Sequence, residues 1–178
     1  FPHLIELVEN SQFDTIYHEH FSYLSLFSTK QIFEKQGLKI VKVEILPTHG
    51  GSIRIYATHA ENNMEVEGSV NEVLGKELEK GINKIEYYTG FQNKALRIKL
   101  EVLDFLIKQK LQSKKVVAYG AAAKGNTLLN YCGIKSDLIE FVVDANPSKQ
   151  NKYLPASHIP IFSEEMIRMH EPDFVLIL

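Results

Sequence analysis

The chain has 178 residues, of which 44% are apolar and 24% are charged, close to the averages of folded globular proteins. With 20 Lys and Arg against 22 Asp and Glu the formal net charge is -2, so no basic field exists to hold nucleic acid or an anionic membrane. The single cysteine, Cys132, excludes an internal disulfide and a cysteine-cluster zinc site, and it suits a reducing compartment such as the cytoplasm.

The two ends of the sequence predict an excerpt of a longer protein. The N-terminus has no initiator Met, no basic region and no long apolar run, so it resembles neither a signal peptide nor a membrane span. The chain stops in the apolar run 173–178, which is typical of a buried parallel strand followed by further chain.

The first third predicts irregular structure followed by a hairpin. Residues 1–26 are rich in His and aromatic side chains and only weakly periodic. We expect a short helix over 29–36, capped by Ser28 and stopped at Gly37. Apolar and polar residues then alternate over 38–46 and 52–58, which predicts two half-buried strands around a turn with two glycines.

Residues 65–112 contain no proline and are dominated by helix-forming residues, so they predict helices. Gly75, Gly81 and Gly90 mark the expected breaks. Leucines and an isoleucine recur at spacings of three and four, which favours a connecting helix that buries an apolar face over a functional groove. This stripe is Leu96, Leu100, Leu103, Ile107 and Leu111.

From Lys115 the pattern changes to apolar strands that alternate with helices, which predicts an α/β fold with a parallel, doubly wound sheet of Rossmann-like type. The expected elements are a strand over 116–119, a helix over 122–131, a strand over 139–144, a helix over 163–169 and a strand over 174–178.

The first candidate site is the cluster Tyr17-His18-Glu19-His20. A phenol, two imidazoles and a carboxylate in consecutive positions provide the positioned donors and acceptors that proton abstraction requires. A metal site at His18 and His20 is an alternative, but it would have only two ligands and lacks the HExxH spacing. A polar surface turn is the remaining alternative.

The second candidate is His49-Gly50-Gly51-Ser52-Ile53-Arg54. Paired glycines let backbone amides approach a ligand, and Ser52 and Arg54 are donors for an anionic or sugar oxygen. Taken alone, the motif is more often a tight hairpin turn.

The third candidate is the turn from Gly120 through Ala121 and Lys124 to Asn126, between an apolar strand and a helix. Phosphate binds readily at such a helix N-terminus. The turn is neither a P-loop nor a complete GxGxxG motif, but Asp144, at the end of the next strand, has the place of a ribose-binding acid. A degenerate nucleotide site and a structural turn both remain open.

Taken in order, four motifs resemble the S-adenosylmethionine-dependent C-methyltransferases that act on nucleotide-linked keto sugars. They are Phe13-Asp-x-Ile-Tyr-x-Glu-His20, His49-Gly-Gly-Ser-x-Arg54, Tyr119-Gly-Ala-x-Ala-Lys124 with Asn130-Tyr-Cys-Gly133, and Asp144-x-x-Pro-x-Lys-Gln150.

The resemblance implies three parts: residues 1–64 as the end of a methyltransferase catalytic domain, 65–112 as connecting helices, and 113–178 as a truncated Rossmann-like C-terminal domain. It also implies that His20 is the general base, with Tyr17 and Glu19 beside it, and that a nucleotide-linked keto sugar is the substrate.

The glycine-rich loop for S-adenosylmethionine, its acidic residue and the zinc-binding cysteines of that family are absent from this sequence. We therefore expect the cofactor site and a further N-terminal part in the rest of the polypeptide, and no metal here. The alternative is a non-catalytic Rossmann-like module that binds a nucleotide or nucleotide sugar.

Overall fold

The computed structural model describes all 178 residues and divides them into two compact units. Unit 1 comprises residues 1–12 and 20–92, and unit 2 comprises residues 13–19 and 93–178. The helical stretch 65–112, which the sequence sets apart as a connection, is thus divided between the units. No helix combines the length and the apolar character that crossing a membrane needs.

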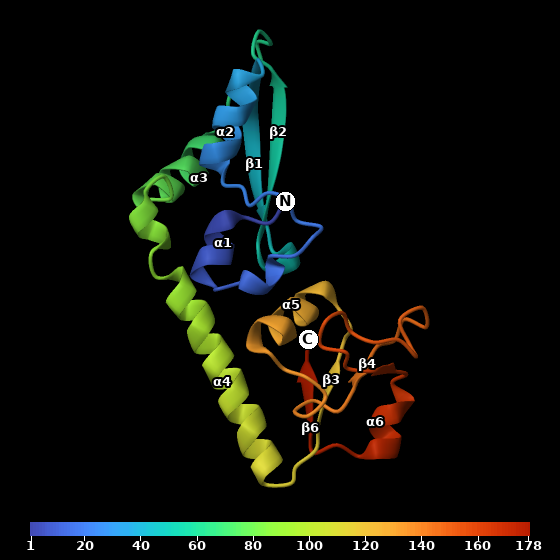
Figure 1. The fold of residues 1–178 in the computed structure, drawn as a ribbon. Helices are drawn as coiled ribbons and strands as arrows, with labels where there is room; N and C mark the ends of the chain where they lie inside the picture. Colours follow the sequence, from blue (N-terminus) through green and yellow to red (C-terminus); the bar gives the residue numbers. More distant parts are fainter. The chain divides into compact units, whose positions relative to one another are not determined.

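Unit 1 is a two-stranded hairpin with helices on one face (Figure 1). Strands β1 (Leu38–Leu46) and β2 (Ser52–His59) pair antiparallel, which confirms the predicted hairpin. Helices α2 (Leu26–Lys35) and α3 (Gly68–Glu79) pack on β1 and on each other. The buried side chains of this core are Leu26, Ile40, Val43, Ile53, Val70 and Val73.

The start of α2 corrects the prediction by one turn. Its N-cap is Ser25, whose hydroxyl accepts the Ser28 N–H at 3.0 Å. Ser28 is instead the third helical residue, and its own hydroxyl accepts the Ser25 N–H at 3.1 Å, which completes a reciprocal capping box. The helix ends at Lys35, just before Gly37 adopts a φ of 71°.

The remaining helices partly confirm the predicted breaks. The short helix α1 (Leu4–Glu9) belongs to unit 1, and the turn η1 (Phe13–Thr15) belongs to unit 2. Gly81 and Gly90 lie between α3, η3 (Ile85–Tyr88) and α4 (Phe91–Leu111), as predicted. Gly75 does not break a helix, because it lies inside α3.

Unit 2 is a Rossmann-like α/β domain with a four-stranded parallel sheet in the order β5-β4-β3-β6 (Figure 1). Helices α4 and α5 (Ala123–Cys132) cover one face, and α6 (Glu165–His170) covers the other. The strands are β3 (Val116–Tyr119), β4 (Val142–Val143), β5 (Ile161–Phe162) and β6 (Phe174–Ile177).

Three details of unit 2 differ from the prediction. The strand expected over 139–144 is limited to the two residues of β4, and β5 was not predicted, because two-residue strands carry too little periodicity to recognise. The apolar stripe of α4 is mostly exposed, with Leu100 at 56% and Leu111 at 81%. The helix packs through Leu106, at 1% exposure, with Val102 and Leu103 beside it.

Gly125, in the first turn of α5, permits a close approach of this helix to the end of β6. A Cβ built on Gly125 would lie 2.5 Å from the Cβ of Leu178, an atom that cannot swing away. Gly125 therefore has the same packing role as the third glycine of a dinucleotide-type turn, because the absence of a side chain lets the helix pack closely on the sheet.

We expect Gly125→Ala to destabilise the protein by about 1–3 kcal/mol, because helix α5 or strand β6 must shift to admit the methyl group. Gly75→Ala is the matched control: it is also helical, but nothing lies within 4 Å of its added Cβ. That change should stabilise by about 0.5–1 kcal/mol through helix propensity. Urea unfolding measures both, and equal effects of the two substitutions would contradict the packing role of Gly125.

Candidate functional site

The carboxyl ends of the parallel strands form one edge of the unit 2 sheet, where ligands of open α/β folds usually bind. Gly120 follows β3 with a φ of 98°, and its N–H donates to Val143 O at 2.8 Å. Strands β4 and β5 lie on one side of β3 and β6 on the other, so the order of the strands reverses at β3. The predicted glycine turn therefore lies at a topological switch point.

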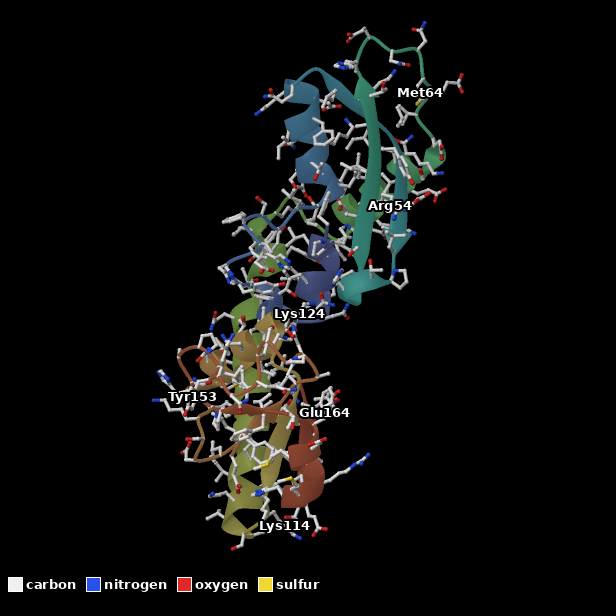
Figure 2. The ribbon with its side chains drawn as sticks, turned by 90° about the vertical axis from the view of Figure 1, so that its right-hand side faces the viewer. Arg54, Met64, Lys114, Lys124, Tyr153 and Glu164 are labelled. Atoms are coloured by element: carbon white, nitrogen blue, oxygen red, sulfur yellow. The ribbon has the colours of Figure 1, made fainter.

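Helix α5 begins directly after this turn without a side-chain cap. Its N-cap is Ala122, whose side chain makes no hydrogen bond. The first amides of a helix have no intrahelical acceptor, and the helix dipole makes this end electropositive. Lys124 lies in the same first turn (Figure 2) and adds a cation. The arrangement suits an anionic group such as a diphosphate.

At the same sheet edge, the side chain of Asp144 accepts hydrogen bonds from other residues of unit 2. Its Oδ2 accepts the Ala121 N–H at 2.7 Å and Lys149 Nζ at 3.0 Å, and its Oδ1 accepts the Asn146 N–H at 2.8 Å. Burial alone would raise the pKa of the carboxyl, but the bonds from Asn146, Lys149 and Ala121 outweigh it and hold the pKa below the usual value. The ionised carboxylate of Asp144 thus holds the glycine turn in place through the Ala121 N–H.

A cavity of about 280 Å³ in unit 2 brings the first and third candidate motifs together. Its wall is largely apolar, and Asn126 is one of the polar residues that line it. The Oδ1 atom of Asn126 is itself buried and has no hydrogen-bond partner. The η1 turn, three residues before His18, packs on α5. The lining residues are Tyr17, His18, Ala121, Ala122, Ala123, Asn126, Thr127, Leu154 and Pro155.

The acid/base cluster, residues 17–20, lies in an irregular segment, and the boundary between unit 2 and unit 1 falls after Glu19. Tyr17 and Glu19 are grouped with unit 2, and His20 is grouped with unit 1. The side chains of His18 and Glu19 are 85% and 68% exposed, whereas Tyr17 and His20 are half-buried. No group of three or more His, Cys, Asp or Glu side chains is arranged to hold a metal ion.

The second candidate motif lines a different cavity, of about 440 Å³, within unit 1. His49, Ser52 and Arg54 contribute to its wall, and Figure 2 shows Arg54 on β2. His49 adopts a φ of 55°, an uncommon conformation for a residue with a side chain. The Ser52 hydroxyl already donates to Thr48 O at 2.9 Å, and Arg54 Nη1 lies 3.4 Å from Glu44 Oε2.

The two glycines of that motif pack against helix α1 and its following residues. A Cβ on Gly51 would lie 2.4 Å from Cγ of Glu6, and a Cβ on Gly50 would lie 2.6 Å from Nε2 of Gln12. Both glycines have positive φ, as the predicted turn requires. Packing accounts for the two glycines, and the polar residues of this motif that line the cavity are His49, Ser52 and Arg54.

The sequence analysis assigned no role to two charged groups that hold these regions in place. One is Lys149, which bridges Asp144 and the carbonyl oxygen of Ala121 at 3.0 Å each. The other is Glu77, whose side chain is fully buried in unit 1. A signal existed for Glu77, because its spacing from Val70 and Val73 puts a carboxylate on the apolar face of α3.

The fold and this sheet edge define a Rossmann-like domain with a cavity beside its switch point. A family model described as "C-methyltransferase C-terminal domain" matches residues 47–178, and the chain belongs to that family. The C-methyltransferase NovU of Streptomyces niveus is 41% identical over 177 residues, which are 99% of this chain and 42% of that protein. These matches confirm the C-methyltransferase resemblance, and the chain spans less than half the length of this relative.

Proposed function

We propose that the whole protein transfers a methyl group from S-adenosylmethionine to a carbon next to the carbonyl of a nucleotide-linked keto sugar. This chain contributes the base and part of the substrate site. The observation that carries the proposal is the unit 2 cavity, which joins Tyr17 of the acid/base cluster to the glycine turn of α5. Family membership and the likeness to NovU support the type of reaction.

The proposed chemistry begins with removal of a proton. The carbonyl acidifies the neighbouring C–H bond, so the His20 imidazole takes the proton and leaves an enolate. The Tyr17 phenol, three residues away along the chain, donates a hydrogen bond to the enolate oxygen. S-adenosylmethionine, when bound elsewhere in the whole protein, would supply the methyl group to the enolate carbon and would leave as S-adenosylhomocysteine.

The residues of this chain do not fit the methyl donor. A dinucleotide-type turn needs a middle glycine for close approach and a free acid for the ribose. Here Ala122 stands at the position of the middle glycine, and both carboxylate oxygens of Asp144 are already bonded within the protein. We therefore assign the donor to the rest of the polypeptide and keep the glycine turn for the sugar nucleotide.

The sugar nucleotide is proposed to place its diphosphate at Lys124 and the first amides of α5. Asn126 lines the same cavity and is a further proposed contact of the sugar nucleotide. His49, Ser52 and Arg54 form a second proposed contact for sugar or phosphate oxygens. Gly50, Gly51 and Asp144 support these surfaces through packing and hydrogen bonds.

A second candidate function is a nucleotide-sugar binding module without catalysis. It is favoured by the fact that the sheet, the α5 turn and the cavity all lie within unit 2. Both functions predict that a nucleoside diphosphate sugar raises the melting temperature, by the equivalent of about 2.7 kcal/mol at 100 times its dissociation constant. Only the enzyme has a use for an imidazole base at position 20.

We expect the full-length protein to transfer a labelled methyl group from S-adenosylmethionine to a nucleotide-linked keto sugar, and the 178-residue chain to transfer none. The reason is the absence of a donor site among these residues. Mass spectrometry of the sugar nucleotide measures both. Turnover by the isolated chain would contradict the assignment of the donor, and no turnover by the full-length protein would favour the binding module.

A further inference from the structure

Helix α3 carries a carboxylate in the interior of unit 1. Glu77 is 0% exposed and has three hydrogen-bond partners. Its Oε1 atom accepts the Leu26 N–H at 2.7 Å and lies 2.7 Å from His3 Nε2. Its Oε2 atom accepts the Phe27 N–H at 2.6 Å.

These three partners lie at the starts of two helices. His3 is the N-cap residue of α1, and Leu26 and Phe27 are the first two residues of α2. The Glu77 side chain thus lies at the electropositive end of the α2 dipole. Glu77 therefore ties the beginning of α1 to the beginning of α2, and the chain that runs between these two points contains Tyr17, Glu19 and His20.

Glu77 and His3 together form what we call the anchor. Further contacts hold the segment between His20 and α2 to it. Leu24 pairs with His3 in a β-bridge, and its carbonyl accepts the Leu4 N–H at 3.1 Å. The Tyr23 hydroxyl donates to the carbonyl oxygen of His20 at 3.0 Å. Hydrogen bonds and the β-bridge thus connect Glu77 and His3 to Leu24, and the residue before it in the chain, Tyr23, bonds to the backbone of His20.

Packing alone gives no reason for a carboxylate at this position. Burying an ion costs several kcal/mol, and replacing a buried ion pair by apolar residues is often neutral or stabilising. Val70 and Val73 on the same face of α3 provide the ordinary apolar contacts to the hairpin. Directional hydrogen bonds to two consecutive amides do what an apolar side chain cannot do, since they fix where α2 begins.

We propose that Glu77 is a positioning residue that orders the segment 20–27 and thereby sets the backbone of His20. The role of His20 as the base rests on the proposed function, but the ordering of the segment does not. His3 is the second member of this anchor, and Tyr23 transmits its position to His20.

The test uses the full-length protein and compares Glu77→Gln with Val43→Ala. Glutamine keeps the shape of the side chain but turns an amide donor toward amide donors. Val43→Ala is the matched control, because Val43 is buried in the same core but lies on β1. Amide hydrogen exchange of residues 20–27 is followed together with kcat and KM for methyl transfer, well below the unfolding temperature.

Glu77→Gln should speed exchange in residues 20–27 and lower kcat about tenfold, within the roughly 100-fold that a misplacement of about 1 Å can cause. The KM for the sugar nucleotide should change less than about threefold, because binding contacts are kept. Val43→Ala should lower the melting temperature and leave both the local exchange and kcat near the wild-type values. Tyr23→Phe should lower kcat in the same direction as Glu77→Gln.

Wild-type exchange of residues 20–27 in Glu77→Gln would overturn the proposal, and so would a loss of kcat in Val43→Ala equal to that in Glu77→Gln. If the wild-type protein transfers no methyl group, the proposed function fails. The exchange measurement still decides in that case whether Glu77 orders the segment.

Discussion

His20→Asn in the full-length protein should lower the turnover of methyl transfer by about 100- to 10,000-fold, the usual contribution of a positioned general base. Asparagine keeps the approximate size of the side chain but cannot take a proton near neutral pH. The substrate should still bind, because the proposed diphosphate and sugar contacts come from other residues. The KM should therefore change much less than kcat, and initial rates over a range of sugar nucleotide concentrations separate the two constants.

Two further substitutions show whether the loss is specific to position 20. His59→Asn is the matched control, because His59 is an exposed histidine at the end of β2, outside every proposed contact. It should keep wild-type turnover. Glu19→Gln should cost less than His20→Asn, since its proposed role is to orient. If His20→Asn remained near wild type, the base would be another residue, and His49→Asn is the next variant to measure.

Lys124→Ala should raise the KM for the nucleotide sugar by about 10- to 100-fold, the range of a hydrogen bond to a charged group. The kcat at saturation should change little, because a diphosphate remote from the reacting carbon is held about equally in the ground and transition states. Saturation curves of the full-length enzyme measure both constants. The salt dependence of KM should also weaken, since one cation fewer faces the phosphates.

The competing explanation is that the turn only packs helix α5 on the sheet. In that case Gly120→Val would destabilise the fold, because Gly120 has a φ of 98° and its Cβ would lie 3.2 Å from Leu178 O, while Lys124→Ala would change neither constant. Lys135→Ala is the control for a general loss of charge, because Lys135 is an exposed lysine beyond the other end of α5. An unchanged KM in Lys124→Ala would remove the turn from the binding site and leave Gly120 with a folding role.

Much of the local structure could be predicted because it depends on neighbouring residues. The alternation of apolar and polar residues predicts β1 and β2, and the glycines at 50 and 51 predict the turn between them. The strand, glycine turn and helix from Val116 to Cys132 follow from the same kind of signal.

The errors arose where two local signals compete or where none exists. Ser25 and Ser28 are both good N-cap residues, and only the burial of Leu26 and the carboxylate of Glu77 decide that α2 begins at the first of them. The stripe on α4 matched a helical period, but Leu106 rather than Leu100 or Leu111 meets the sheet. Periodicity identifies a helix without telling which of its apolar residues the neighbouring elements will cover.

Local patterns in the sequence were enough to identify the side chains available for chemistry. They are a histidine and phenol cluster at 17–20 and a glycine turn before a helix, with no cysteine or charge pattern for a metal or nucleic acid. The sequence also carried the motifs that identify the family. Three features of the candidate regions depend on the tertiary structure: Tyr17 shares a cavity with the turn at Ala121, Asp144 accepts the Ala121 N–H, and Glu77 lies at the start of α2. Each of these pairings joins residues far apart in the chain, so it depends on how the elements pack rather than on any local pattern.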